Sequence, residues 1–255
     1  MYFYKCSWII FVCCIFFSCT NHMQERIQYT LHQAGENSSE LKKVLDHYQN
    51  QPEKLKAARF LIANIPAHRT YVGKEIDSLK QMKKESIQQG RISDEIVTHW
   101  KSFDYSSSQV VKDIDVIKAD ILIENIDLAF EAWEKRSWSK QYSFEDFCEY
   151  VLPYRIGDEP LEKWRRIYYE RYSPVLDSLY QGNDVVEAAR VMANYLKEEG
   201  FTNHTDFNLP HLGALFLLEN RVGYCRDNCD IATYVMRSLG IPITMDFYEM
   251  SPSYN

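Results

Sequence analysis

Cys225 has the setting that an activated thiol needs. It follows the Gly223-Tyr224 turn and stands at the start of an expected helix that ends at Gly240-Ile241-Pro242. The first N–H groups of a helix have no intrahelical acceptor, and the helix dipole favours an anion there, so this placement favours a thiolate. The backbone N–H of Cys225 can also donate to an oxyanion. We therefore predict a nucleophile at Cys225, and a buried structural cysteine at a helix start is the alternative.

The other cysteines do not suggest a disulfide framework or a metal site. Behind the leader and its Cys19, the chain keeps Cys148, Cys225 and Cys229, which is too few for a framework. Cys229 lies one helical turn after Cys225, a poor disulfide geometry within a regular helix, and no His stands close by to complete a metal site. We interpret Cys229 as a small packing residue, and the sequence predicts no metal and no cofactor.

The expected helix carries a buried apolar stripe and a polar residue just before it. The stripe consists of Ala232, Val235, Met236 and Leu239, with Ile231 beside it. Asn220, five residues before Cys225, is a candidate for a side chain that assists the oxyanion hole. Capping or turn formation is the alternative for Asn220.

Most of the chain that precedes this helix has helical patterning. Helices are expected at residues 37–49, 52–64, 93–103, 119–135, 143–151, 161–172 and 184–199, with capping residues at several of their starts. Residues 74–89 are charged and rich in Gln, and they predict a solvated helix or a loose connection. The aromatic residues of 164–172 favour a core position over a carbohydrate platform; they are Trp164, Tyr168, Tyr169 and Tyr172.

The first residues predict the compartment. Residues 1–18 carry a Lys and then an apolar run that is too short to cross a bilayer as a mature helix, as in the apolar region of a secretory signal. The run ends in Phe16-Phe17-Ser18-Cys19, which resembles a bacterial lipobox. We expect Cys19 to be the lipidated N-terminus of a protein anchored to the outer membrane. Thr20-Asn21-His22 lacks an acidic run, which favours the periplasmic face; an ordinary signal peptide is the alternative.

Composition limits the partners. The net charge of −7 and the absence of a basic run argue against nucleic acid as a partner. A hydrophobic content of 45%, with 14% aromatic residues, is ample for a packed core. The length fits one large domain or two small ones.

The cysteine segment resembles the nucleophile helix of the transglutaminase-like superfamily. The matching residues are Gly223, Cys225, Arg226, Asp227, Arg237, Gly240, Ile241 and Pro242. The resemblance extends back through the helix expected at 184–199. Upstream, residues 143–166 are similar to the helical N-terminal region of transglutaminase-like lipoproteins of Bacteroidetes. The resemblance implies a papain-like fold and a Cys-His-Asp triad, of which Cys225 is the residue that carries over.

The rest of the implied triad has no counterpart in this sequence. The segment Ile243–Phe247 is expected to form the first strand of the family's sheet, and the strands with His and Asp should follow it, but the sequence ends at Asn255. His204 and His211 both precede Cys225 and do not match the family order. We expect a fragment, because a lone strand would leave a sheet edge uncovered. A natural truncation without activity and a base at an unrecognised position remain open.

Together these observations predict an α+β protein with three regions. A signal peptide spans residues 1–18, a mainly helical region 19–180, and the first half of a papain-like transglutaminase core 181–255. The expected function is an envelope cysteine enzyme that hydrolyses or transfers an amide bond of a peptide or glycopeptide through an acyl-enzyme at Cys225. Because the His and Asp that the resemblance implies are missing, the chain as given is expected to be inactive. A non-catalytic lipoprotein that binds glycan or protein is the alternative, and a pseudoenzyme is a third possibility.

Overall fold

The computed structural model describes residues 22–88, 94–203 and 209–246. The expected leader, the expected lipidation site Cys19 and His204 lie outside these residues. Within them, helices dominate and the strands are few and short. None of the described helices combines the length and the apolar character that a membrane span needs.

The elements follow one another as a series of helices with two small sheets. After helical residues 22–33, the helices are α2 (Ser38–His47), α3 (Pro52–Asn64), α4 (Lys74–Gln88), α5 (Asp94–Ser102), α6 (Asp113–Val116), α7 (Ala119–Lys135), α8 (Phe144–Tyr150), α9 (Arg165–Leu179), α10 (Val185–Glu199), α11 (Ala214–Asn220) and α12 (Cys225–Ser238). The strands β1 (Arg69–Val72) and β2 (Gln109–Lys112) are antiparallel, and β3 (Thr202–Asn203) and β4 (Val222–Gly223) are parallel.

Most expected helices are confirmed, and their ends have physical causes. Ser143 caps α8 by accepting the N–H of Asp146, and Asp184 caps α10 by accepting the N–H of Val186. Gly200, with φ 79°, ends α10.

Helix α9 differs from its expected range of 161–172. It starts at Arg165 and runs to Leu179 through Pro174. Burial of Tyr172 and Leu176 on successive turns offsets the backbone hydrogen bond that proline removes. Trp164, Tyr168 and Tyr172 are buried, as expected for core residues, whereas Tyr169 is only half-buried.

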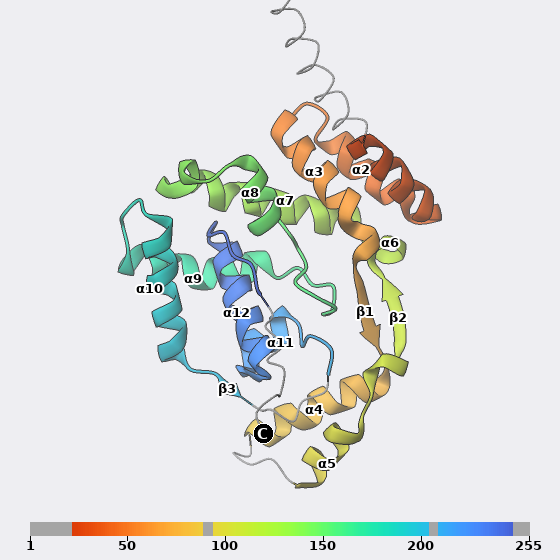
Figure 1. The fold of residues 1–255 in the computed structure, drawn as a ribbon, viewed down its shortest axis with the longest axis vertical. Helices are drawn as coiled ribbons and strands as arrows, with labels where there is room; N and C mark the ends of the chain where they lie inside the picture. The colour runs from red at the N-terminus through yellow and green to blue at the C-terminus, as the bar shows by residue number, and fades with distance from the viewer. Residues whose placement is uncertain (1–21, 89–93, 204–208, 247–255) are drawn as a thin grey trace, which may run out of the picture.

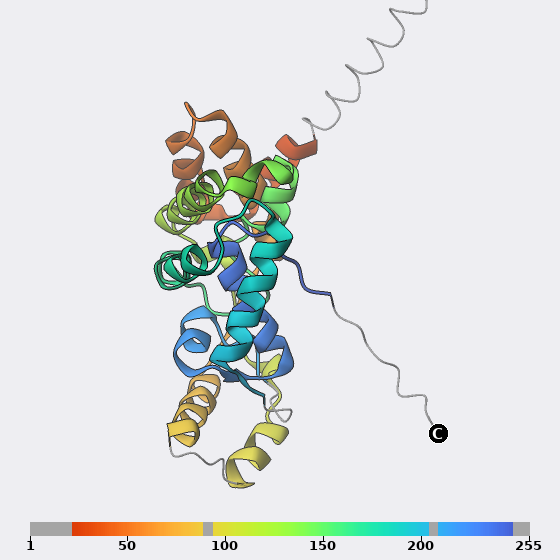
Figure 2. The same ribbon diagram turned by 90° about the vertical axis from the view of Figure 1, so that its left-hand side faces the viewer.

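The described residues form two hydrophobic cores; the helices of the first lie in the upper part of Figure 1, and those of the second lie mostly below them. The N-terminal core packs residues 22–33, α2, α3, α7 and α8 together. The C-terminal core is formed by α4, α9, α10, α11 and α12, and includes Trp138. Figure 2 shows α10 lying along α12. Helix α4 is not solvated on all sides, because its Ile76 and Leu79 side chains are buried. The expected boundary between residues 180 and 181 falls between α9 and α10, which share this core.

Arg165 connects the two cores. Its guanidinium is buried and donates to the side-chain oxygen of Asn125 on α7 at 2.9 Å and to the carbonyl of Arg237 on α12 at 2.7 Å. It also donates to the carbonyls of Val151 and Leu152, at 2.9 and 3.2 Å. These acceptors include a backbone carbonyl near the C-terminal end of α12, so the arginine holds that end of the helix in the core.

The strand expected at Ile243–Phe247 is not observed in its described part. Residues 243–246 form no strand, and Phe247 lies outside the described residues. The N–H of Ile243 donates to the carbonyl of Tyr150, at the end of α8, at 3.4 Å. A strand needs a paired neighbour for its backbone groups, and α8 cannot be one. The prediction of a first sheet strand is therefore wrong for residues 243–246.

Candidate functional site

Cys225 is the first residue of α12, as the sequence predicts, and it is exposed. Strand β4 delivers the chain to this position, because Val222 and Gly223 pair with Thr202 and Asn203 of β3. Val222 and Gly223 are buried, so the thiol stands at the point where a fixed segment meets solvent. The first-turn N–H groups of α12 have no acceptor within the helix. The arrangement places a free thiol beside N–H groups that have no intrahelical acceptor.

Asp227 fixes the first turn of α12. Its side chain is fully buried, and Oδ2 accepts the backbone N–H of Tyr224 at 2.7 Å. Gly223 lies against it: a Cβ at Gly223 would come within 2.5 Å of the Cβ of Asp227. Glycine is therefore required there by close approach. Oδ1 of Asp227 lies 3.6 Å from the guanidinium of Arg226. This carboxylate supports the helix start in the way that acidic groups at N-termini do.

Cys229 is exposed, so its interpretation as a packing residue is wrong. Residues four apart lie on the same face of a helix, and the face that carries Cys225 is open to solvent over the first turns. Partial burial, Asp230 and Cys225 together raise the pKa of the Cys229 thiol. Cys148 behaves differently: it is buried in the N-terminal core, and burial raises its pKa to about 12.

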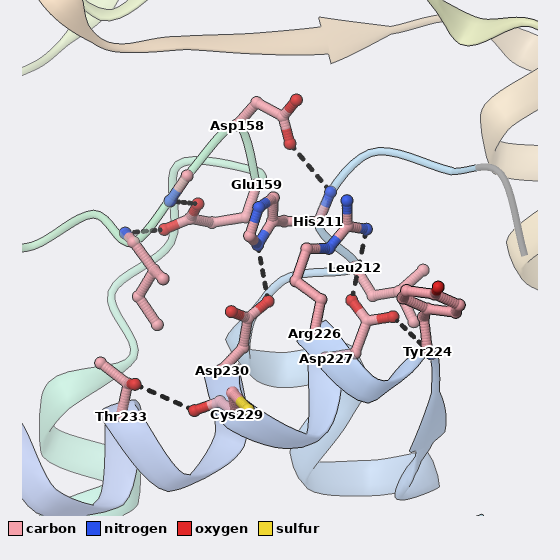
Figure 3. Close-up of polar contacts among 12 residues, drawn as sticks. Asp158, Glu159, His211, Leu212, Tyr224, Arg226, Asp227, Cys229, Asp230 and Thr233 are labelled. Atoms are coloured by element: carbon pink, nitrogen blue, oxygen red, sulfur yellow. Dashed lines mark hydrogen bonds and ion pairs between the residues drawn. The ribbon is translucent and has the colours of Figure 1, made fainter. Parts of the chain in front are cut away.

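The structure contains a His–carboxylate pair that the sequence did not predict. Nδ1 of His211 lies 2.6 Å from Oδ2 of Asp230, which is fully buried on α12 (Figure 3). Burial opposes a charge on His211, but the hydrogen bond and charge of Asp230 outweigh it and raise the His211 pKa. Burial raises the pKa of Asp230 to about 6, although His211 favours its charged form.

The loop before α9 encloses His211. A Cβ on Gly157 would overlap the imidazole Nε2, so the ring occupies the space that this glycine leaves open. Asp158 accepts the backbone N–H of His211 at 2.9 Å. Glu159 shapes the loop by accepting the N–H groups of Ile156 and Gly157, each at 2.7 Å. Figure 3 shows this loop facing α12 across the imidazole.

His211 and Cys225 do not form a nucleophile–base pair in this structure. Asp230 is five residues after Cys225, so the two side chains leave α12 about 140° apart around its axis. Among the described residues, no hydrogen bond joins the His211 ring to Cys225 or Cys229. The Asp230 side chain that binds His211 thus leaves α12 in a different direction from the Cys225 thiol.

The remaining candidates have structural roles or form no site. Nδ2 of Asn220 donates to the carbonyl of Phe216 at 2.9 Å, a local bond at the end of α11 that fits its alternative role in capping. Across residues 22–88, 94–203 and 209–246, the His, Cys, Asp and Glu side chains form no group that could hold a metal ion.

A sequence signal for the His211–Asp230 pair does exist. Asp227 and Asp230 lie three apart, and Ile231 and Tyr234, which extend the same side of α12, are buried with them. Acidic side chains on the buried side of a helix need partners. The spacing therefore indicates buried partners, although it does not say which residues they are.

Comparisons of the chain with family models, with curated proteins and with solved structures gave no match.

Proposed function

We propose that this protein is a thiol enzyme of the cell envelope in which Cys225 attacks an amide carbonyl. The observation that carries the proposal is the exposed thiol on the first residue of α12, held by β4 before it and by Asp227 behind it. A nucleophile needs access to substrate and a fixed position, and this thiol has both. The resemblance of Gly223–Pro242 to the transglutaminase-like nucleophile helix supports the same role.

The reaction would follow an acyl-enzyme route. The Cys225 sulfur bonds to the carbonyl carbon, the C–N bond breaks, and the amine leaves with a proton; water or a second amine then releases the acyl group from the thioester. The backbone N–H groups of the first turn are suited to stabilise the oxyanion. Residues 226–246 contain no histidine, and the His211 ring binds Asp230 rather than Cys225, so we assign no base.

The substrate class and the location belong to the same proposal. The resemblance favours a peptide or glycopeptide, and the lipobox-like sequence at Cys19 favours an anchor in the outer membrane. The competing function, a lipoprotein that binds glycan or protein without catalysis, requires no reactivity at Cys225.

A comparison of the two exposed thiols tests the proposal. The rate of alkylation by iodoacetamide at about pH 6.5 is measured in the Cys229→Ala variant, which reports Cys225, and in the Cys225→Ala variant, which reports Cys229. We expect Cys225 to react faster than both Cys229 and a model thiol. We further expect a thioester of Cys225 with a peptide amide to be trapped by mass spectrometry in the Cys229→Ala protein and absent from the Cys225→Ala protein. Reaction of Cys225 no faster than the model thiol would refute the nucleophile.

A further inference from the structure

The segment 209–212 is attached to α12 at two points one helical turn apart. The guanidinium of Arg226 donates to the carbonyl of Leu209 at 2.9 Å, and Asp230 holds the His211 ring at 2.6 Å. Arg226 directly follows Cys225, and Asp230 lies on the next turn. The segment therefore spans the first two turns of α12, and Figure 3 shows its His211 ring between Asp230 and the loop before α9.

The 209–212 segment also contacts two other elements, the loop before α9 and helix α4. Gly157 and Asp158 enclose the ring and the backbone of His211, as described above. From α4, Nζ of Lys80 donates to the carbonyl of Leu212 at 3.1 Å. Leu209 and Leu212 are themselves buried in the C-terminal core. The segment is thus fixed by core packing at its two leucines, and its polar contacts reach the first turns of α12.

We propose that His211 is a positioning residue for Cys225: with Asp230 it ties the 209–212 segment to the second turn of α12, and so keeps the first turn, with its thiol and its N–H groups, in place. This inference rests on the proposed role of Cys225. The end turn of a helix frays readily because its N–H groups make no intrahelical bonds. Arg226 alone would tie the segment to the fraying turn, whereas Asp230 ties it to the stable part of the helix.

The proposal predicts a pH dependence. The charged pair requires an ionised Asp230 and a protonated His211, so it weakens once the pH rises through the raised His211 pKa. A neutral imidazole can still donate to Asp230, but a charge-assisted bond is about twice as strong as a neutral one. The charged groups near the pair are Arg226, Asp227 and Arg237 on α12, Asp158, Glu159 and Glu162 in the loop before α9, and Lys80 on α4.

The test measures the alkylation rate of Cys225 per thiolate in the full chain, in a Cys229→Ala background, from about pH 6 to pH 9. The thiolate fraction comes from its ultraviolet absorbance, and the His211 titration from the imidazole resonances in NMR. We expect the rate per thiolate to fall, by up to about tenfold, as the pH passes the His211 pKa. In His211→Gln the alkylation rate per thiolate should be low at every pH and show no such step. The same result is expected in Gly157→Ala, because the new Cβ displaces the His211 ring.

Two matched variants control for general destabilisation. Asp158→Asn keeps an acceptor for the His211 N–H and leaves the charged pair intact, so it should retain the step. His68→Gln removes another half-buried histidine, one that contacts Tyr154, and should also retain the step. If the alkylation rate per thiolate of the protein with His211 intact shows no step at the His211 pKa, the proposal is refuted. This result does not require any variant at His211 or Gly157 to fold.

The outcomes separate this inference from the proposed function. If the alkylation rate shows the step but no thioester forms, the proposed enzymatic function is refuted and the positioning role of His211 is supported. Thioester formation with identical profiles in wild type and His211→Gln would keep the enzyme and refute the role of His211.

Discussion

The buried carboxylate of Asp227 accepts the N–H of Tyr224 at 2.7 Å, one residue ahead of Cys225. Asp227 therefore holds the backbone that leads into Cys225, the residue that the sequence indicates as a nucleophile. The close approach of Gly223 leaves no space in which Asp227 could move without moving the turn. The turn that leads into Cys225 is thus held by a short local set of contacts.

Replacement of Asp227 tests this dependence. We expect Asp227→Ala to lower the free energy of unfolding by about 1–3 kcal/mol, because it removes the acceptor for Tyr224 and the anion beside Arg226. The alkylation rate of Cys225 should fall with it. Urea denaturation gives the first quantity. Asp184→Ala, which removes the cap of the exposed start of α10, is the control; an equal or larger loss there would contradict the special role of Asp227.

The ion pair of Arg155 and Asp113 is a second testable feature. Both side chains are only 1% exposed, Nε of Arg155 donates to Asp113 at 2.7 Å, and a second guanidinium nitrogen donates to Thr70 at 2.8 Å. Arg155→Met would leave a buried carboxylate without its cation, so the free energy of unfolding should fall by about 3–5 kcal/mol. Arg190→Met, which breaks an exposed pair with Glu187, should have little effect in the same urea titration. Similar losses for both variants would contradict the prediction.

Stability should depend on pH through His211 and Asp230. The folded pKa of His211 lies above its ordinary value of 6.5, so its contribution is fully present below that pH and is lost as the pH rises through the folded pKa. The pKa of Asp230 is raised to about 6, so its ionisation in the folded state also disfavours the fold as the pH rises toward 6. We expect the urea midpoint of wild type to decline from about pH 5 to pH 8 more steeply than that of the double variant His211→Gln/Asp230→Asn, which lacks both titrating groups. Parallel curves would show that this pair does not contribute.

The three cysteines of the described chain should separate by reactivity. Cys225 and Cys229 are exposed, whereas Cys148 is buried with a pKa raised to about 12. Native protein at about pH 8 should therefore take up iodoacetamide at two of these positions, and unfolding in urea should add the third. Peptide mapping by mass spectrometry identifies the sites. Modification of native Cys148 at the rate of Cys229 would contradict its burial.

Local signals predicted the helices well, and contacts distant in sequence explain the errors. The caps at Ser143 and Asp184 and the start of α12 at Cys225 depend on neighbouring residues, which the sequence displays. Helix α9 extends beyond its expected end at residue 172, because burial of Leu176 against other helices offsets the effect of Pro174. That burial depends on residues distant in sequence.

The site shows the same division. The placement of Cys225 at a helix start was predicted from neighbouring residues, but the exposure of Cys229 depends on which face of α12 the other helices leave open. The His211–Asp230 pair joins residues 19 positions apart, and the glycine that admits the imidazole ring lies in yet another loop. The sequence shows that Asp230 shares the buried side of α12, and only the fold supplies its partner.

Arg165 has a consequence for how the protein unfolds. Its guanidinium binds Asn125 and two carbonyls beside the N-terminal core, and the carbonyl of Arg237 beside the C-terminal core. If either core opened alone, some N–H groups of the Arg165 guanidinium would stay buried and lose their acceptors, which costs free energy. Complete unfolding avoids this cost, because water then accepts those hydrogen bonds. The two cores should therefore lose structure in one cooperative transition, and a single calorimetric peak is expected from a molecule with two hydrophobic centres.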